Sequence, residues 1–509
     1  MTYKLDCHAQ PDTSGAKCII KHYKPNYISN RSIYLVSPNF TAVVRWMAMR
    51  RIRMQATTGL ELTGMGGLVL VGALLKRFTN FQASFNSALV KGPGGIPFGD
   101  VLIPGLAMLC TGKSDFEAVS LLRGSTWAAR ALQVGRIASP ETLRQNLDLL
   151  GERACPVSLE IIETAIIDVL RNTKMRPSAL WTGHVALDID TSPQDNGKTK
   201  KEGIGRTYDG GMGYCPILAY AGLEGFLIGS EFRTGTQHSQ KNAPAFIASQ
   251  LQRLRSLGVD RVLVRLDSGF DAAETMLTIR DENADFIISV NPRGEDGNLW
   301  IEQAKALPAS AWIRPDGVRN LRVAYLERVE TRRDKQGREI QVRRIVRVKK
   351  RLMIEVPEKD GHAPILRRWV GFEVGSSWST NLELLASVIA RLYEDHGTSE
   401  QFHAELKGEL DLERLPSGKF KTNELVFQLG CLAFNLLRIL GIKGKAVFHH
   451  RNPSKRRRMK TVIQELILLP ARFLGGSGQM KLDLGKSHPS KDAILALHRE
   501  LVLTLPRAA

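Results

Sequence analysis

The stretch HVALDID, at residues 184–190, alternates apolar residues in the way that a half-buried β-strand does. Because strand side chains alternate between two faces, Asp188 and Asp190 share one face. A second stretch, RVLVRL at residues 261–266, predicts another strand, and Asp267 follows it directly. Side chains beyond strand ends in α/β sheets are well placed for chemistry, so we expect Asp190 and Asp267 to converge.

Two carboxylates that converge repel each other unless a cation lies between them. An all-oxygen site of this kind suits a hard divalent metal, Mg²⁺ or Mn²⁺. Each aspartate taken singly also fits a structural role, because Asp190 precedes a turn and Asp267 precedes a helix start. The two aspartates together therefore predict a metal site, whereas either one alone could be a metal ligand or a purely structural residue.

The segments around these two strands continue the pattern of an α/β fold. A helix is expected at residues 243–257, and Asp271 with Glu274 matches a capping box for a second helix. Further strands are expected at residues 213–220, 226–232 and 285–290. The order of three strands, helix, strand, helix, strand predicts an α/β domain.

Two more helices are expected downstream. Apolar residues at 384–392 predict a helix that should stop at Gly397. Thr398 and Gln401 then match a capping box for a helix that runs to about residue 410.

Glu400, His403 and Lys407 fall on one face of this second helix. An acid, a proton carrier and a cation on one face suit a site where the acid binds metal and the lysine holds a phosphate. A solvated helix face carries the same mixture, so the residues alone leave both interpretations open.

Composition bounds the class of protein. The 509 residues predict two or three domains, and 43% hydrophobic with 24% charged residues is typical of globular chains. The 71 Lys and Arg against 51 Asp and Glu give a net charge of +20, which favours a polyanionic partner. The six cysteines form no CxxC pair, and the apolar stretch at residues 65–75 is too short to span a bilayer. We therefore expect a reduced, cytosolic protein without a zinc site and without a membrane partner.

About 130 residues separate Asp267 from Glu400, too many for a loop, so an inserted domain is expected. Residues 321–329 and 340–356 alternate around a turn at 335–337 and predict a β-hairpin. Residues 331–351 carry ten Lys or Arg, which suits either a phosphate-gripping ribbon or a charged, solvated edge strand. The four tryptophans of the insertion, for which core packing is expected, are Trp300, Trp312, Trp369 and Trp378.

The two ends of the chain carry weaker signals. Residues 1–58 have no steady period, whereas 59–177 are helical, with Ser139 before Pro140 as a helix start. This helical region is either a DNA-end-binding domain or an ordinary bundle. Residues 425–440 predict a buried apolar helix, and the basic stretch 450–460 either contacts DNA or is solvated.

Four motifs in order resemble those of DDE insertion-sequence transposases. YEDHGTSEQFHAELK, at residues 393–407, is similar to the family signature of Tyr, two residues, Arg, three residues, Glu, six residues, Lys. It departs from that signature at His396, where the family has Arg. LDIDTSP at 187–193, EFRTGTQHS at 231–239 and RLDSGF at 265–270 resemble the other core motifs. Over about residues 59–441, including GKSDFEAVSLLRG at 112–124, the chain most resembles the insertion-sequence family numbered thirteen-eighty.

The resemblance implies an α/β fold with a ribonuclease-H-like catalytic core, an inserted β-rich domain and an N-terminal helical domain. It implies that Asp190, Asp267 and Glu400 are catalytic and bind two Mg²⁺ or Mn²⁺ ions. Asp188 shares the strand face of Asp190, and we prefer Asp190 because it comes last before the Thr-Ser-Pro turn. Residues implied to contact DNA are Tyr393, His396 and Lys407.

The activity implied is cleavage at the ends of an insertion sequence, followed by strand transfer into target DNA. The partners implied are double-stranded DNA, as terminal inverted repeats and target, and a second copy of the chain on DNA, in a bacterial, nucleoid-associated location. Two alternatives remain: a nuclease of the same fold without strand transfer, and a non-catalytic DNA-binding protein derived from a transposase. The expected regions are 1–58 (extension), 59–177 (helical, DNA-end-binding), 178–295 and 379–445 (the two parts of the core), 296–378 (insertion) and 446–509 (basic C-terminal region).

Overall fold

The computed structural model describes residues 60–91, 94–315, 317–318, 320–354, 367–445, 456–475, 480–486 and 488–503. The expected N-terminal extension, residues 1–58, lies outside the described residues. The unit Gly59–Ala509 holds all of the described helices and strands.

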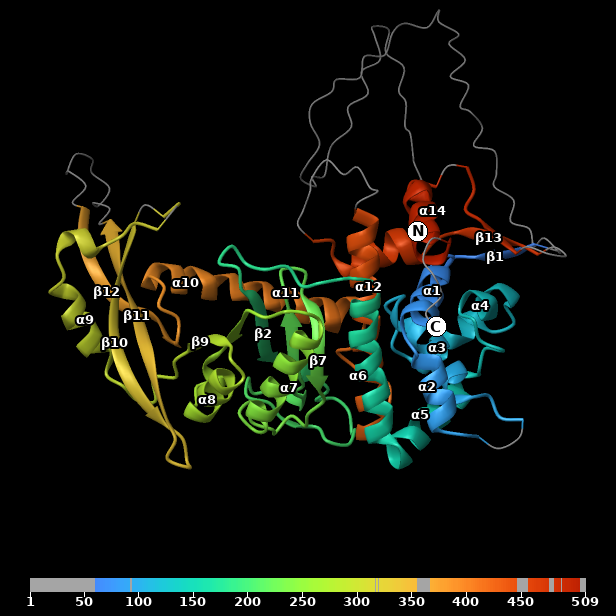
Figure 1. The fold of residues 1–509 in the computed structure, drawn as a ribbon, viewed down its shortest axis with the longest axis horizontal. Coiled ribbons are helices and arrows are strands. Elements are labelled where there is room, and N and C mark those ends of the chain that lie inside the picture. The colour runs from blue at the N-terminus through green and yellow to red at the C-terminus, as the bar shows by residue number, and fades with distance from the viewer. Residues whose placement is uncertain are drawn as a thin grey trace, which may run out of the picture. The chain divides into compact units, whose positions relative to one another are not determined.

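This unit mixes helices and strands along its whole length (Figure 1). The α-helices are α1 (Leu68–Phe78), α2 (Phe81–Ala88), α3 (Phe98–Leu109), α4 (Thr126–Ala131), α5 (Pro140–Arg153), α6 (Cys155–Asn172), α7 (Ala243–Ser256), α8 (Ala273–Asp281), α9 (Gly297–Lys305), α10 (Ala386–Glu394), α11 (Thr398–Ala404), α12 (Phe420–Lys445), α13 (Met459–Val462) and α14 (Lys491–His498). The 3₁₀ and π turns are η1 (Phe116–Leu122), η2 (Ser268–Phe270), η3 (Ala309–Ala311), η4 (Asp395–Gly397), η5 (Glu405–Glu409), η6 (Ile463–Ile467) and η7 (Arg499–Leu503). The strands are β1 (Glu61–Thr63), β2 (Val185–Thr191), β3 (Gln194–Asp195), β4 (Gly205–Arg206), β5 (Met212–Tyr214), β6 (Ile217–Ala221), β7 (Phe226–Glu231), β8 (Val262–Leu266), β9 (Asp285–Ser289), β10 (Leu321–Arg333), β11 (Glu339–Ile354), β12 (Arg367–Thr380), β13 (Ala471–Leu474) and β14 (Lys481–Asp483).

The main sheet has eight strands in the order β10-β11-β12-β9-β8-β2-β6-β7. Strand β8 is parallel to both β2 and β9, and the other neighbours are antiparallel. The strands predicted at 184–190, 226–232, 261–266 and 285–290 are confirmed as β2, β7, β8 and β9. The result is a mixed α/β fold.

The prediction of one strand at residues 213–220 is wrong. The segment forms β5 and then β6, and the two belong to different sheets, because β5 pairs with β3 and β4. Pro216 lies between them and has no N–H with which to continue a ladder, and its carbonyl instead accepts from Ser192 N–H.

Both faces of strand β2, in the middle of the sheet, are buried. Leu187 and Ile189 of β2 contribute to the main core, which the helices α6, α7 and α12 also line. On the other face, Ala186 of β2 packs in a smaller cluster with Ile389 of α10. The face of β2 that carries Asp188 and Asp190 therefore looks towards α10 and the turns that follow it.

The helices of residues 68–172 pack around α12, which contacts α3, α5 and α6. The helix start predicted at Ser139 is confirmed, since its hydroxyl accepts from Thr142 N–H at the first turn of α5. Helix α12 is long and apolar enough to cross a membrane, but 94% of its most apolar window is buried inside the protein. Asn435 of α12 also accepts from the Leu227 N–H and donates to the Leu227 carbonyl of β7. The buried helix predicted at 425–440 is therefore confirmed.

The predicted β-hairpin is confirmed as β10 and β11, joined by a turn at Asp334–Arg338 (Figure 1). A third long strand, β12, pairs with β11 along its length and then with β9 through Trp378, Ser379 and Thr380. The inserted strands thus extend the central sheet. Trp300, Trp312 and Trp378 are buried, as expected for core packing, while the side chain of Trp369 lies outside the described residues.

Candidate active site

Asp190 and Asp267 lie side by side at the ends of two parallel strands. The register pairs Ile189 of β2 with Leu266 of β8, so the next residue on each strand is one of the two acids. Thr191 N–H donates to Asp190 Oδ1 at 2.7 Å, and Gly269 N–H donates to Asp267 Oδ1 at 3.0 Å. Burial and the charge of Asp190 raise the pKa of Asp267 to about 6. The two carboxylates thus lie close together, and each accepts a hydrogen bond from one backbone N–H.

Asp188, the alternative first acid, is occupied inside the protein. The guanidinium of Arg265 donates to both of its carboxylate oxygens, at 2.6 and 2.7 Å, and also to the Leu392 carbonyl at 2.6 Å. His396 Nδ1 lies 3.0 Å from Asp188 Oδ1. Burial works to raise the pKa of Asp188, but Arg265 and His396 outweigh it and hold that pKa below its usual value. This geometry favours Asp190 as the acid available to a ligand.

The helix that carries the third acid does not begin as predicted. Gly397 does not stop the preceding helix: α10, η4, α11 and η5 follow one another without a break from Ala386 to Glu409. Thr398 donates to the Asp395 carbonyl, so the capping box expected with Gln401 does not form. The 3₁₀ turn η4 joins α10 to α11 at Gly397, so no separate helix start is formed there. The carbonyls at the end of α10 accept the first hydrogen bonds of the segment that follows.

One stripe of this helix run faces the strand-end acids. His396, Glu400, His403 and Lys407 are spaced four, three and four residues apart, the spacing of a single helix face. Three of them make contacts along β2 and the turn after it: His396 with Asp188, His403 Nε2 with Asp190 Oδ2 at 3.7 Å, and Lys407 Nζ with the Pro193 carbonyl.

Glu400 lies between two of these contacts along the stripe, and no contact of its own side chain is found among the described residues. Its side chain is exposed. Within the described ranges, no group of three or more His, Cys, Asp or Glu side chains is close enough to hold a metal ion. The structure therefore brings Asp190 and Asp267 together and places Glu400 on the facing stripe. The three carboxylates do not lie close enough together in it to share one metal ion.

Two tyrosines flank the acids, and sequence analysis singled out only one of them. Burial, together with the charges of Asp267 and Asp190, raises the pKa of Tyr393 to about 12, although its hydrogen bond with Ser289 opposes the shift. Tyr208, which was missed, lies with its hydroxyl 3.5 Å from the Thr191 carbonyl, and partial burial with the charge of Asp190 raises its pKa to about 12. The glycine-rich stretch GRTYDGGMG around Tyr208 was the available signal, since such turns often carry functional groups.

The motif at residues 231–239 packs next to the end of β2 that carries Asp190. Arg233 is fully buried, bonds to Glu231 at 3.0 Å and donates to the Ser239 carbonyl at 3.2 Å. Ser239 Oγ lies 3.2 Å from Thr191 Oγ1, next to Asp190. The motif therefore packs against the end of β2, which explains its place among the family motifs.

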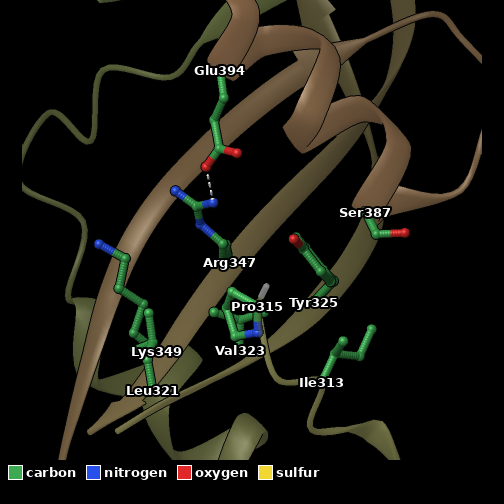
Figure 2. A pocket seen from close by; sticks show the side chains of 9 residues that line it. All are labelled: Ile313, Pro315, Leu321, Val323, Tyr325, Arg347, Lys349, Ser387 and Glu394. Atoms are coloured by element: carbon green, nitrogen blue, oxygen red, sulfur yellow. Dashed lines mark hydrogen bonds and ion pairs between the residues drawn. The ribbon is translucent and has the colours of Figure 1, made fainter. Parts of the chain in front are cut away.

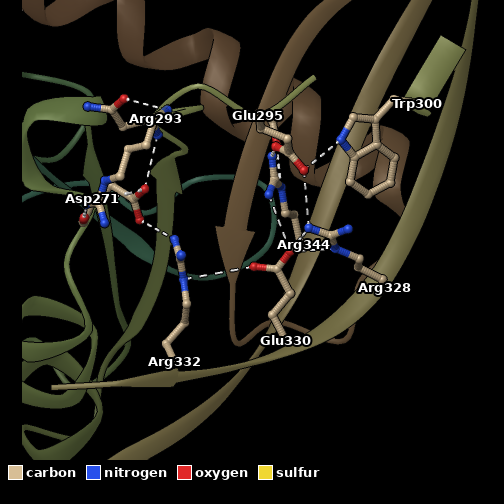
Figure 3. A network of polar contacts seen from close by, with 10 residues as sticks. Asp271, Arg293, Glu295, Trp300, Arg328, Glu330, Arg332 and Arg344 are labelled. Carbon is tan, nitrogen blue, oxygen red and sulfur yellow. Dashed lines mark hydrogen bonds and ion pairs between the residues drawn. The ribbon is translucent and has the colours of Figure 1, made fainter. Parts of the chain in front are cut away.

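Asp271 has a different role from the predicted helix cap. Helix α8 begins at Ala273 with no side-chain cap, and the Asp271 carboxylate accepts from Asn291 N–H at 3.0 Å and from Arg332 Nη2 at 2.7 Å. Figure 3 shows this contact at one end of a chain of charged groups. Through Glu330, Arg344 and Glu295 the chain crosses the inserted hairpin and reaches Trp300. The hairpin is thus tied to the turn that follows Asp267.

The basic ribbon of residues 331–351 is largely paired with carboxylates. Among its arginines, Arg332 pairs with Asp271, Arg343 with Glu327 and Arg347 with Glu394. Other paired members of the ribbon are Arg333, Arg338, Arg344, Lys349 and Arg351. Figure 2 shows the Arg347–Glu394 pair in a pocket of about 350 Å³ between the hairpin and α10. This surface therefore presents less free positive charge than its composition suggests.

The basic C-terminal stretch is similarly engaged where the structure describes it. Arg456 donates to Glu405, a fully buried carboxylate that also accepts from Arg438 at 2.6 Å. Arg458 donates to Glu409 at 2.7 Å. These arginines hold the π turn η5, next to the helix that carries Glu400, and the choice between DNA contact and solvation for the basic stretch stays open.

A family model described as transposase DDE domain group 1 matches residues 45–505. The chain belongs to this family. No curated protein sequence matches it. Among solved structures, it is similar to the cryo-EM structure of the piggyBac transposase synaptic complex with hairpin DNA, at 10% identity and a TM-score of 0.40, over 78% of this chain and 80% of that one.

The DDE transposase match reaches further than the resemblance seen in the sequence. It begins at residue 45, inside the segment set apart as an extension, and it continues through the C-terminal elements β13, β14 and α14. Strand β13 pairs with β1 at residues 61–63, so the two ends of the matched region meet in one small sheet.

Proposed function

We propose that this DDE transposase cuts DNA at the ends of an insertion sequence and transfers the freed strand ends into target DNA. The observation that carries the proposal is the pair Asp190 and Asp267, adjacent at the ends of parallel strands and faced by the stripe that carries Glu400. The sequence motifs at residues 187–193, 231–239, 265–270 and 393–407 support a ribonuclease-H-like core and membership of the insertion-sequence family numbered thirteen-eighty. The resemblance that they carry also supports action as a dimer on double-stranded DNA.

The acids suit a hard divalent cation. Asp190 and Asp267 offer oxygen donors, and burial together with the charge of Asp190 raises the pKa of Asp267. We propose that Asp190, Asp267 and Glu400 bind Mg²⁺ or Mn²⁺, with Glu400 turning from solvent towards the pair. A bound ion would stabilise the charge that develops on the phosphodiester oxygens during displacement.

The surrounding residues position these acids and the DNA. The ion pair of Asp188 with Arg265 fixes β2 against β8 and, through the Leu392 carbonyl, holds α10 over both strands. His396 is a second partner of the Asp188 carboxylate, whereas the resemblance to the family signature implied a contact with DNA at this position. Tyr393 and Lys407 remain proposed DNA contacts; the bond of Lys407 to the Pro193 carbonyl uses one of its three N–H donors.

In the reaction proposed, a water molecule attacks the phosphodiester at the element end and leaves a 3′-hydroxyl. That hydroxyl then attacks a phosphodiester of the target, and the bond that forms replaces the one that breaks. In strand transfer one phosphodiester bond forms as another breaks, with a 3′-hydroxyl of the target strand as the leaving group, so this step needs no nucleotide cofactor.

The test is cleavage and joining of a plasmid that carries the inverted repeats flanking the gene, with Mg²⁺ or Mn²⁺. We expect Asp190→Asn, Asp267→Asn and Glu400→Gln each to lose both reactions by at least about 10³-fold while still binding DNA. Matched controls are Asp260→Asn, an exposed acid before β8, and Asp395→Asn, an exposed acid before α11. Both controls should retain activity.

Three results would count against the proposal. Cleavage without joining would favour a nuclease of the same fold. Binding without either reaction in the wild type would favour a non-catalytic DNA-binding protein. An active Glu400→Gln variant would remove Glu400 from the set of acids.

A further inference from the structure

His403 is a buried polar residue that makes no hydrogen bond through its ring in the part of the chain that the structure describes. The residue is 8% exposed, and neither ring nitrogen has a hydrogen-bond partner there. Tyr220 packs edge-on against the ring at 5.3 Å, and within the same described ranges the Tyr220 hydroxyl also has no hydrogen-bond partner. An unsatisfied buried imidazole is costly, so a position of this kind calls for a ligand.

The distance from His403 to Asp190 is too long for a direct hydrogen bond, but it leaves the two atoms close enough to share a cation after a small movement. His403 Nε2 lies 3.7 Å from Asp190 Oδ2. A hydrogen bond between these atoms would be about 2.7–3.2 Å long. Two adjacent donors that each lie about 2.1 Å from an octahedral ion are about 3.0 Å apart, so a small rotation of the imidazole brings both atoms within reach of one ion.

The other histidine on the same stripe provides an internal comparison. His396 is equally buried, but its Nδ1 lies 3.0 Å from the Asp188 carboxylate, which Arg265 also holds. That histidine is satisfied by the protein itself. His403, further along the same face, meets the carboxylate that is free for a ligand.

We propose that His403, through Nε2, is a ligand of the divalent ion that Asp190 binds, which makes the site a mixed oxygen and nitrogen site. This inference rests on the metal site of the proposed function. Imidazole binds Mn²⁺ more readily than Mg²⁺, because Mg²⁺ is the harder ion and strongly prefers oxygen donors. The site should therefore prefer Mn²⁺ to Mg²⁺ by more than three carboxylates alone would.

The experiment is a Mn²⁺ titration of the full-length protein, followed by electron spin echo spectroscopy of the bound ion. We expect wild-type protein to bind Mn²⁺ with a ¹⁴N coupling typical of a histidine ligand. His403→Phe should lose the coupling and bind Mn²⁺ at least about tenfold more weakly. His396→Asn, the matched variant on the same helix face, should keep the coupling.

The outcomes separate the inference from the function beneath it. Mn²⁺ binding that Asp190→Asn abolishes, but without a ¹⁴N coupling or with the coupling intact in His403→Phe, overturns the role of His403 and leaves the metal site standing. Absence of Mn²⁺ binding, or binding that Asp190→Asn does not change, overturns both. If His403→Phe does not fold, wild-type protein labelled with ¹⁵N-histidine decides the point, because a histidine ligand must change the coupling pattern.

Discussion

At the scale of single residues, the carboxyl group of Asp267 carries an electrostatic cost that a bound cation would relieve. Burial and Asp190 raise its pKa to about 6, above the value of about 3.9 for an unfolded chain. The folded state therefore holds this proton more tightly, and ionisation of Asp267 destabilises the fold as the pH rises from about 4 through 6. The penalty is fully present only above about pH 7, where Asp267 is almost completely ionised.

We therefore expect Asp267→Asn to raise the free energy of unfolding in metal-free buffer. Asparagine keeps the acceptor for Gly269 N–H but carries no charge, so the gain should reach at most about 3 kcal/mol at pH 8. At pH 5 the gain should be smaller by roughly 1 kcal/mol, because wild-type Asp267 is then mostly protonated. Urea unfolding at the two pH values, with a chelator present, measures both quantities.

The exposed Asp260→Asn variant, at the other end of β8, is the control and should show no such pH dependence. Adding Mn²⁺ should reverse the order of stability, because the ion stabilises only the state that binds it. A gain that is equal at both pH values, or a loss of stability at pH 8, would contradict the assignment of repulsion to this pair.

The residues of the site were predictable to the extent that they belong to local patterns. Alternation in 184–190 was enough to place Asp190 beside a second strand end. It could not separate Asp190 from Asp188, because both share one face and their difference lies in Arg265, which comes from a neighbouring strand. The partner of His396 was hidden for the same reason: it is a contact between segments about 200 residues apart.

At the scale of elements, the turn after β8, which carries Asp267, and the inserted hairpin are joined by the pair of Arg332 with Asp271. The Asp271 side chain is fully buried and Arg332 is 25% exposed, so removing the arginine leaves a buried carboxylate short of a partner. The helix cap predicted for Asp271 failed because the sequence motif cannot show that β10, about 60 residues away, supplies a stronger partner.

We expect Arg332→Met to destabilise the protein by about 1–3 kcal/mol and to loosen the turn at residues 267–271 locally. Hydrogen exchange followed by mass spectrometry should show faster exchange in that turn and in β10. Arg333→Met is the matched neighbour: its side chain is 68% exposed and pairs with Glu339 on the surface, so its effect should stay below about 1 kcal/mol. Equal effects of the two variants, or unchanged exchange in the turn, would show that the hairpin and the site are not coupled through this pair.

The order of elements was more predictable than their boundaries. The hairpin of β10 and β11 follows from alternation and a turn, both of which are local. The addition of β12, which makes the insertion part of the central sheet, depends on pairing between strands distant in sequence. Similarly, Gly397 predicts a helix stop, yet α10, η4, α11 and η5 follow one another through it without a break.

At the scale of the whole molecule, the net charge is +20. We expect affinity for DNA to depend less on this total than on how many basic side chains are not already paired with carboxylates. The ribbon of residues 331–351 has ten basic residues, and ten phosphate contacts would give a salt slope of about −9. Most of those side chains are held by carboxylates within a few ångströms, as Arg343 is by Glu327. We therefore expect a much shallower slope for non-specific DNA.

Lys335 should account for a visible part of that slope. It lies at the exposed turn of the hairpin, and no contact of its side chain is found among the described residues. Lys335→Gln should reduce the slope of log Kobs against log salt by about 0.9, the value for one phosphate contact. The measurement is fluorescence anisotropy of a labelled duplex of random sequence across a series of salt concentrations. Lys481→Gln, an exposed lysine on β14, removes the same charge elsewhere and should leave the slope unchanged. If both variants shift the slope equally, net charge governs binding and the hairpin turn makes no phosphate contact of its own.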